Sequence, residues 1–288
     1  MKMSLYQEVR AALRESVFRP RKSLGQNFLI QENVIESIIR LLALDRGDGV
    51  VEIGPGLGFL TRRLLQQAGQ VWAVEVDRAL VASLRQTGWA MEPGLHLIHG
   101  DILAVPLPQI LPELKFKLVG NLPYSIATPV LFRIFDWHAH FSSLVLMVQK
   151  EVAERIAAAP GTKNYGTLSV WCQLYGRISE KFVVSREAFF PRPRVRSTVL
   201  KIDLFDEPLA GAGELPYLRS LVRAAFSQRR KTLSNTLMAW LELPRGEIDR
   251  LLLSCGIDPK RRGETLNVDE FVTLSSYLST RSVPGADH

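Results

Sequence analysis

The sequence predicts an α/β fold with a mostly parallel sheet, followed by a smaller all-helical domain. Two observations support this prediction. Over the first 150 residues, short apolar segments of strand length alternate with segments of helical periodicity, a pattern typical of parallel sheets covered by helices. From residue 217 onward only helical patterns remain. The chain of 288 residues is long enough for one large and one small domain.

The predicted elements follow one another in a regular order. Apolar residues recur at helical spacing over 34–42, so this segment is expected to be a helix. Predicted strands are 50–53, 71–76, 95–98, 117–119 and 144–148, and predicted helices after them are 59–65, 79–86, 128–135 and 150–158. Two further strand-like segments, 182–184 and 197–204, have no helix between them, which predicts an antiparallel edge.

Three parts of the chain are expected from composition. Residues 1–22 form a basic lead, residues 23–206 the α/β domain, and residues 207–288 the helical domain. We place the second boundary at 206–215, because this segment is rich in Gly, Pro, Ala and acidic residues, as linkers are.

Bulk composition narrows the class of protein. A net charge of +7 and a pI near 9.6 favour a polyanionic partner. Cys172 and Cys255 are far apart in apolar surroundings, which indicates reduced thiols in a cytoplasmic protein. No apolar run reaches membrane-spanning length, and the N-terminus lacks an apolar signal core. His138 and His140 have no third partner of suitable spacing, so we expect no metal site.

Three features stand in order at the carboxyl ends of the first predicted strands, where α/β sheets bind ligands. A glycine loop, Gly54-Pro55-Gly56-Leu57-Gly58, lets the backbone approach a ligand closely. Glu75 ends the next strand, about 20 residues on, and can accept hydrogen bonds from both hydroxyls of a ribose. Asp101 follows the strand after that and can accept one from an adenine amino group. Taken alone, the glycine loop also fits a plain turn, and each of the two acidic residues also fits a solvated carboxylate.

Together these features predict a cofactor that contains adenosine. The loop has the spacing G-x-G-x-G, and Phe59 stands where dinucleotide-binding enzymes prefer a third glycine. No P-loop motif is present in the sequence, which disfavours ATP hydrolysis. The pattern favours S-adenosyl-L-methionine over NAD.

The tetrapeptide Asn121-Leu122-Pro123-Tyr124 follows a predicted strand and a glycine. The Asn121 amide oxygen and the Leu122 carbonyl can each accept one hydrogen bond from the N6 amine of an adenine. Pro123 fixes the turn without a competing donor, and Tyr124 can stack on the base. The alternative is an Asx-type turn with a buried tyrosine. The cofactor features on the same sheet edge favour methyl transfer to N6, a reaction that needs positioning rather than a strong general base.

A set of segments carries a family resemblance over nearly the whole chain. They are 22–29 (KSLGQNFL), 51–56 (VEIGPG), 75–77, 100–102, 120–124 (GNLPY), 149–152, 165–166, 189–197 (FFPRPRVRS) and 225–232. In this order they closely resemble the rRNA adenine N6-dimethyltransferases, in particular the bacterial enzymes that modify the small subunit.

The resemblance implies a Rossmann-like class I methyltransferase domain with a small C-terminal all-α domain. It implies S-adenosyl-L-methionine contacts from Asn27, Leu29, Gly54, Glu75, Asp101 and Asn121, to which the loop adds Gly56. It also implies that Phe189 faces the target base opposite Tyr124, whereas the pattern alone equally fits a core aromatic. The lead over 6–19 is longer than the family pattern.

Basic residues form three clusters that suggest phosphate contacts. They are Arg10, Arg14, Arg19, Arg21 and Lys22; Arg186, Arg192, Arg194, Arg196 and Lys201; and Arg219, Arg223, Arg229, Arg230 and Lys231. The residues expected to bind RNA are Arg192, Arg194, Arg223, Arg229, Arg230 and Lys231. Each cluster alone also fits a solvated face. The target adenine must be unstacked to reach the tetrapeptide, so a loop or a flipped nucleotide is expected.

The expected function is dimethylation of N6 on two adjacent adenosines in the 3′-terminal hairpin loop of 16S rRNA. The resemblance implies a pre-30S ribosomal particle as the substrate, and we expect a monomer in the cytoplasm. One alternative is a large-subunit (23S) dimethyltransferase of the macrolide-resistance type. The other is a non-catalytic ribosome assembly factor, against which the retention of Glu75, Asp101, Asn121 and Tyr124 argues.

Overall fold

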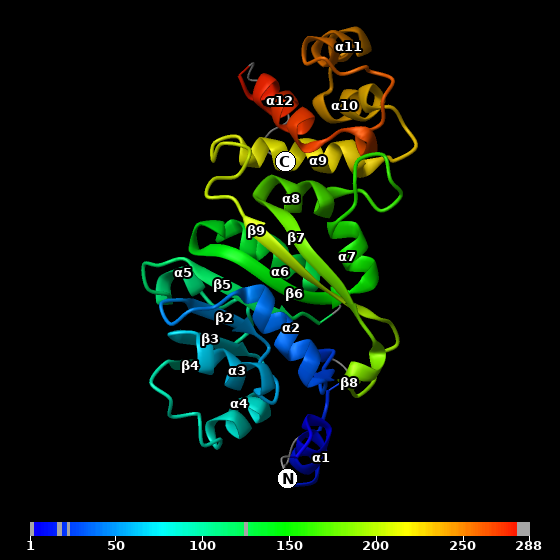
Figure 1. Ribbon diagram of the computed structural model, residues 1–288. Coiled ribbons are helices and arrows are strands. Elements are labelled where there is room, and N and C mark those ends of the chain that lie inside the picture. Colours follow the sequence, from blue (N-terminus) through cyan, green and yellow to red (C-terminus); the bar gives the residue numbers. More distant parts are fainter. Residues whose placement is uncertain (1–2, 16–18, 22–23, 124–125, 281–288) are drawn as a thin grey trace. The chain divides into compact units, whose positions relative to one another are not determined.

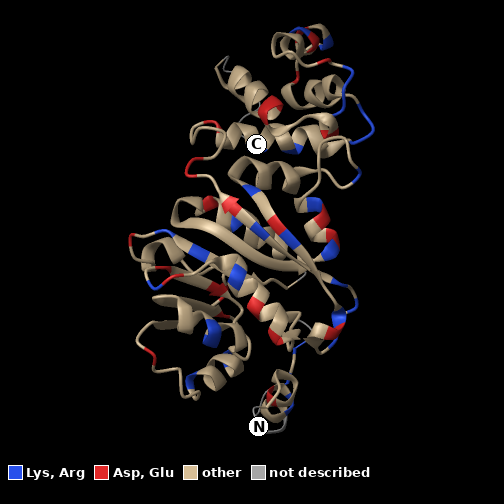
Figure 2. Ribbon diagram, in the orientation of Figure 1, with Lys and Arg blue, Asp and Glu red and all other residues tan. Residues whose placement is uncertain are grey.

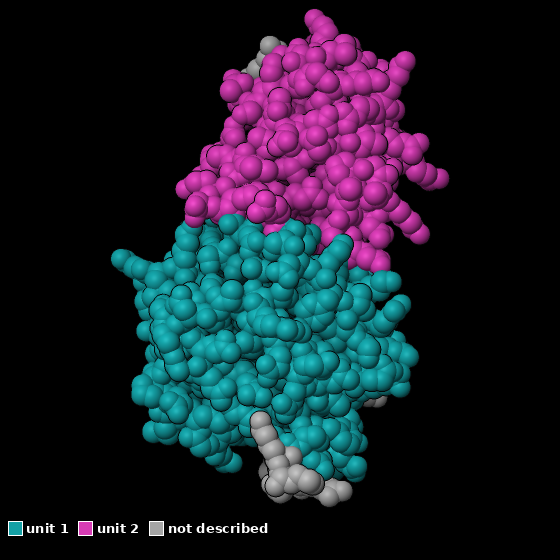
Figure 3. Space-filling model, viewed as in Figure 1, with its two compact units in different colours: residues 1–153, 178–204 teal, residues 154–177, 205–288 magenta. Residues whose placement is uncertain are grey.

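The computed structural model describes residues 3–15, 19–21, 24–123 and 126–280 (Figure 1). The chain folds into two compact units (Figure 3). Unit 1 comprises Met1–Ala153 and Ile178–Leu204, and unit 2 comprises Glu154–Arg177 and Phe205–His288. The helix α7 (Lys150–Ile156) and the strand β7 (Gly176–Val184) each cross the division.

Unit 1 is built on a seven-stranded sheet with the order β4-β3-β2-β5-β6-β9-β7. Besides β7, the strands of this sheet are β2 (Gly49–Ile53), β3 (Gln70–Glu75), β4 (Leu95–His99), β5 (Phe116–Asn121), β6 (Phe141–Gln149) and β9 (Ser197–Leu204). Strands β2 to β6 pair in parallel, and β9 pairs antiparallel with β6. The predicted, mostly parallel sheet is therefore confirmed, and segment 197–204 forms the antiparallel strand β9 beside the edge strand β7.

The helices of unit 1 connect and cover these strands. They are α1 (Leu5–Glu15), α2 (Glu32–Leu42), α3 (Phe59–Gln67), α4 (Arg78–Arg85), α5 (Leu107–Ile110) and α6 (Ala127–Asp136), with short 3₁₀ turns η2 (His138–His140) and η3 (Arg186–Ala188). In α2, the apolar residues that predicted the helix form its buried face, from Val34 to Leu42. They pack with Val50, Val119 and Val145 of the sheet, so burial of one helix stripe fixes α2 against the strands.

A small two-stranded ribbon is separate from the main sheet. It consists of β1 (Phe28–Leu29) and β8 (Phe189–Phe190), which pair antiparallel. Phe28 lies opposite Phe190, and Leu29 lies opposite Phe189. The ribbon joins segments from opposite ends of the α/β domain sequence, which no local pattern could predict.

Apart from the first residues of β7, the regular elements of unit 2 among the described residues are helices. Its helices are α8 (Thr167–Tyr175), α9 (Leu215–Ser227), α10 (Leu233–Leu241), α11 (Arg245–Ser254) and α12 (Val268–Ser279), with the 3₁₀ turn η4 (Gly263–Thr265). Fully buried Leu218, Leu221, Leu237 and Phe271 form its core. The N-terminus of α12 has a capping box, in which the Asn267 side chain accepts from the Glu270 N–H at 2.8 Å.

These units differ from the predicted domain bounds in two places. Segment Glu154–Arg177 belongs to the helical unit rather than to the α/β domain. The Tyr165 hydroxyl donates to the Leu266 carbonyl at 2.8 Å, and α8 packs on α9, so long-range interactions place it there. The predicted basic lead contains α1, which belongs to unit 1. Its apolar residues recur every four positions, a helical signal that the basic composition of the lead concealed.

No helix among the described residues is long and apolar enough to cross a membrane. Both cysteines are free thiols, with Cys172 buried and Cys255 half-buried.

Candidate functional site

The candidate site lies where the sheet changes its direction of winding. The chain runs from β2 outward through β3 to β4, then returns to add β5 and β6 on the other side of β2. Ligands of open α/β sheets bind at such a switch point, beyond the carboxyl ends of the strands. Gly54 directly follows β2, and Asn121 ends β5, so the two strand ends bring the predicted glycine loop and the tetrapeptide together.

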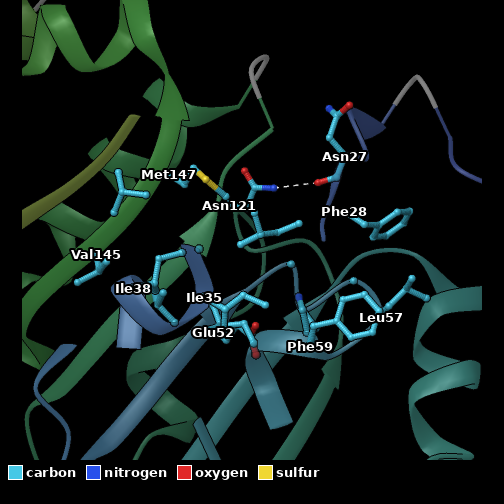
Figure 4. Close-up of a pocket in the computed structure, with 18 residues that line it drawn as sticks. Asn27, Phe28, Ile35, Ile38, Glu52, Leu57, Phe59, Asn121, Val145 and Met147 are labelled. Atoms are coloured by element: carbon cyan, nitrogen blue, oxygen red, sulfur yellow. Dashed lines mark hydrogen bonds between the residues drawn. The ribbon is translucent and has the colours of Figure 1, made fainter. Parts of the chain in front are cut away.

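Two adjoining cavities open at this point. The first, of about 100 Å³, is lined by predicted cofactor residues, among them Asn27, Gly54, Gly56, Glu75, Asp101 and Asn121, together with Pro123. The second, of about 70 Å³, shares Asn27, Gly54 and Asn121 and adds Leu29 and Glu52 (Figure 4). The structure therefore brings all seven predicted cofactor residues to one place.

The glycine loop requires its glycines. Gly54 and Gly56 have φ values of 67° and 60°, in the left-handed region that side chains disfavour. A Cβ on Gly56 would also meet the Phe28 ring at 3.1 Å. The Gly56 N–H donates to Glu75 Oε2 at 3.1 Å, which holds the loop against the next strand.

Glu75 is the centre of a hydrogen-bond network around the first cavity. It is 5% exposed, and burial raises the pKa of its carboxyl. Its second oxygen, Oε1, accepts from the Asp77 N–H at 2.9 Å. Asp77 in turn accepts from Gln26 Nε2 at 2.9 Å, so this network connects the segment before β1 to Glu75. A carboxylate offers about four acceptor sites, which leaves Glu75 able to bind ribose hydroxyls as well.

Asp101 occupies the position expected for an adenine contact. It follows β4, is exposed, and lines the first cavity beside Gly100 and Ile102. Its Oδ1 accepts from the Leu103 N–H at 2.9 Å, which fixes the side chain in a tight turn and leaves Oδ2 to accept from a ligand.

Asn121 has an amide whose orientation the structure determines. Its Nδ2 donates to the Asn27 carbonyl at 3.1 Å (Figure 4). Because a carbonyl oxygen only accepts, the amide nitrogen must face Asn27, and Oδ1 is left to accept from another donor. Asn27 is itself held by its Nδ2, which donates to the Gly25 carbonyl at 2.9 Å.

The rest of the tetrapeptide forms a rigid turn. The Leu122 N–H donates to the Met147 carbonyl of β6 at 3.0 Å, and its side chain is buried. The Pro123 carbonyl accepts from Ile126 and Ala127, both at 3.1 Å, which joins the turn to the start of α6. Tyr124 lies outside the described residues, so its stacking role stays a prediction.

Glu52 is a member of the site that the sequence motifs did not single out. It is 2% exposed, lines the second cavity, and accepts from Thr61 Oγ1 at 2.6 Å. Burial raises the pKa of Glu52 to about 8, so the carboxyl carries a proton at neutral pH. An acid inside an apolar strand, two residues before the glycine loop, was the signal that could have found it.

The two adjacent phenylalanines of β8 have different surroundings. Phe189 is 4% exposed and belongs to the apolar core beside α2, which favours the alternative of a core aromatic. Neighbouring residues of a strand point to opposite faces, and Phe190 instead lines a third cavity beside Asn27. Contact of Phe189 with a target base stays a prediction.

Lys and Arg residues occur around β8 and on the loop between α9 and α10 (Figure 2). Arg192, Arg194, Arg223, Arg230 and Lys231 are exposed, as RNA contacts require. Arg192 forms an ion pair with Glu187. Lys22 and the side chain of Arg14 lie outside the described part of the chain.

Arg229 differs from the other predicted RNA contacts. Its guanidinium donates to Glu264 at 3.1 Å and to the carbonyls of Lys163 and Tyr165 at 2.9 and 3.0 Å. These bonds join the segment after α9 to η4 and to the loop before α8 within unit 2, so Arg229 has a structural role that its place in a basic cluster did not indicate.

No group of three or more His, Cys, Asp or Glu residues suited to a metal ion occurs in the described part of the chain.

The fold and the site together define a Rossmann-like methyltransferase, with a glycine loop, a buried acid at the end of the next strand and a strand-end Asn-Leu-Pro turn. The chain belongs to the ribosomal RNA adenine dimethylase family, whose model matches residues 17–280. The enzymes of this family use S-adenosyl-L-methionine, and the carboxylates and the amide that line the first cavity are the kind of acceptors that its ribose and adenine require.

Individual proteins agree with this membership. The chain is 44% identical to a ribosomal RNA small subunit methyltransferase A of Geobacter metallireducens, over 92% of this chain and 98% of that one. It is 42% identical to the protein of the same description from Moorella thermoacetica, over 93% and 96%. Among solved structures, a dimethyladenosine transferase from Plasmodium falciparum shares the fold, with a TM-score of 0.77 at 24% identity over 89% and 98%. The 23S rRNA methyltransferase ErmE gives a TM-score of 0.64 at 26% identity, over 88% and 100%.

Replacing Glu52 with Gln is expected to flatten the dependence of stability on pH. An acid whose pKa is raised on folding keeps a proton that the unfolded chain releases. The free energy of unfolding therefore falls as pH rises from the ordinary value of 4.5 to about 8. One such group contributes at most about 1.4 kcal/mol per pH unit.

Urea unfolding of both proteins between about pH 5 and pH 8 measures this effect. Gln keeps an oxygen for Thr61 to bind, so the fold is preserved. A stability difference between the two proteins that stays constant across this range would contradict a protonated Glu52.

Proposed function

We propose that this protein transfers methyl groups from S-adenosyl-L-methionine to N6 of two adjacent adenosines in the 3′-terminal hairpin loop of 16S rRNA. The proposed substrate is a pre-30S particle, and the protein acts as a monomer in the cytoplasm. The observation that carries the proposal is the amide of Asn121, which is fixed with its oxygen free at the edge of the cofactor cavity.

The geometry supports N-methylation by positioning. An adenine N6 is a poor nucleophile because its lone pair is delocalised into the ring. Asn121 Oδ1 and the Leu122 carbonyl each accept one N6–H, which directs the lone pair toward the donor. Holding two reactants in line in this way supplies much of the rate enhancement of such reactions. Bound S-adenosyl-L-methionine supplies an electrophilic methyl group.

The residues around the cofactor perform separate tasks. Glu75 binds the ribose, Asp101 receives the adenine amino group, and the glycine loop lets the backbone approach the ligand closely. Asn27 and Leu29 line the wall that β1 contributes. Neutral Glu52 lies at the second cavity, where a protonated carboxyl can both donate and accept a hydrogen bond.

The assignment to the small subunit rests on the relatives. Two small-subunit methyltransferases are 44% and 42% identical over more than nine-tenths of this chain, against 26% for the 23S enzyme. The residues that would serve cofactor binding are all present and line the two adjoining cavities, which argues against a non-catalytic assembly factor.

Methyl incorporation into undermethylated 30S particles and into naked 23S rRNA tests this assignment. We expect labelling of the 30S particles at two adjacent adenosines, and none of the 23S rRNA. Labelling of 23S rRNA alone would overturn the small-subunit assignment, and no labelling of either RNA would support an assembly factor.

Replacing Asn121 with Ala is expected to lower kcat by at least about 100-fold, the usual effect of removing one preorganised hydrogen bond at a reacting centre. RNA binding should change little, because phosphate contacts supply most of that affinity. Single-turnover methylation and filter binding measure the two quantities. Asn33→Ala, at an exposed position of α2, is the matched control. Turnover retained by Asn121→Ala would refute the positioning role.

Replacing Arg230 and Lys231 together with Ala is expected to weaken RNA binding and reduce its dependence on salt. Loss of two phosphate contacts lowers the slope of log K against log salt by about 1.4–1.8. Arg229 is left intact, because its bonds within unit 2 would confuse binding with stability. Arg46→Ala with Arg85→Ala removes the same charge from exposed positions of unit 1. An unchanged slope in the first variant would count against this surface.

A further inference from the structure

The helix α1 lies before the part of the chain that the family model matches. That match begins at residue 17, whereas α1 ends at Glu15. The described helix is nevertheless firmly attached to unit 1. Leu5 is 3% exposed and Val9 is fully buried, in contact with Phe28 and Leu80. Residues four apart lie on one face of a helix, so Leu5, Val9 and Leu13 form a single docking stripe.

The helix contacts the ribbon that serves the site. Phe28 stands between the two β1-side cofactor residues, Asn27 and Leu29, and pairs with Phe190 of β8. The edge of the Tyr6 ring meets the Phe190 ring at 5.8 Å between centroids and 74° between planes. Such edge-to-face contacts stabilise a defined ring orientation. Through Phe28 and Phe190, α1 fixes both strands of the ribbon.

The third cavity lies on this side of the ribbon. It has a volume of about 700 Å³ and is lined by Leu13 of α1, Pro20, Asn27, Gln149 and the segment from Phe190 to Val195. This size falls in the range of about 300–1,000 Å³ that is typical of pockets for small ligands. Leu13 and Pro20 line one wall of this cavity. Pro20 lies within the part of the chain that the family model matches, whereas Leu13 of α1 lies before it.

The lining has the chemistry of a nucleotide site. A half-buried phenylalanine ring and three prolines offer apolar surfaces for a base, and Arg192 and Arg194 lie at the same cavity to meet phosphates. The cavity also includes Asn27, whose carbonyl holds the Asn121 amide. It therefore begins next to the point of methyl transfer.

We propose that this cavity receives the nucleotide adjacent to the target adenosine, and that α1 forms its wall and positions Phe190. The inference rests on the proposed function, because it assumes an RNA strand with its target adenine at Asn121. The amine of the target adenine is assigned to Asn121, which lines the cofactor cavity and is not among the described residues that line this one. A neighbouring base on the same RNA strand is what the third cavity can accommodate.

The test combines protein variants with a modified substrate. Leu13→Ala and Tyr6→Ala shorten the wall and release Phe190, while both positions are exposed enough for the fold to persist, which a melting curve checks. Glu8→Ala is the matched control on α1, because Glu8 pairs with Arg62 at 3.6 Å and is not among the described residues that line the cavity. The substrates are 30S particles reconstituted with intact 16S rRNA or with an abasic residue next to the target adenosine.

We expect the wild type to methylate intact particles and to show a KM roughly 10-fold higher with the abasic particle, the usual effect of losing one stacked base. Leu13→Ala and Tyr6→Ala should raise KM for intact particles by about 5- to 10-fold, with kcat and S-adenosyl-L-methionine affinity unchanged. The variant and abasic effects should not add, because both remove the same contact.

Three results would overturn the inference while the wild type remains active. The first is that Leu13→Ala and Tyr6→Ala have the same KM as Glu8→Ala. The second is that the effects of these variants and of the abasic substrate on KM add fully. The third is that the variants lower kcat or cofactor affinity and leave KM unchanged. The last would show that α1 only supports the cofactor side of the ribbon. A wild type inactive on intact particles would instead refute the proposed function, and with it the assumption on which this inference stands.

Discussion

The hydrogen bond from the Asn121 amide to the Asn27 carbonyl determines the geometry of the site. It joins the end of β5 to the segment before β1, two parts of the chain that meet only through the fold. It also decides which amide atom faces the substrate, because the Asn27 oxygen can only accept. Reversing the amide would present two donors to an adenine amine that is itself a donor. The acceptor needed for N6 therefore exists only while Asn27 stays in place.

Asn27 in turn depends on the buried acid Glu75. Glu75 holds the glycine loop through Gly56 and the start of α4 through Asp77, and Asp77 holds Gln26, the neighbour of Asn27. Each of these bonds satisfies a polar group that burial would otherwise penalise by roughly 1–3 kcal/mol. The same network that stabilises buried Glu75 thus positions Gln26, Asn27 and the glycine loop, the residues that we propose surround the cofactor and the target.

The sequence predicted this arrangement where a physical rule connects spacing to position. Parallel strands end at one edge, so Gly54, Glu75, Asp101 and Asn121 could be assigned to a common site from the sequence alone. No comparable rule predicts from the sequence which distant segments contact one another. The β1–β8 ribbon, the membership of 154–177 in unit 2 and the bonds of Arg229 depend on the tertiary fold. Two features did have local signals in the sequence. Glu52 is an acid within an apolar strand, and α1 has apolar residues at every fourth position, but neither signal is visible in overall charge and composition.

The ribbon explains how one fold can hold two substrates in register. In-line methyl transfer requires a fixed relation between donor and nucleophile, and small displacements of either reduce the rate steeply. Asn27 and Leu29 line the cofactor cavities from β1, while Phe190 of the paired strand lines the cavity on the target side. A movement of the ribbon shifts both walls together and changes their separation little. Docking α1 on Phe28 and Phe190 adds apolar contact to this paired unit. With cofactor and RNA bound as we propose, the helix therefore restrains the relation between the two substrates rather than either one alone.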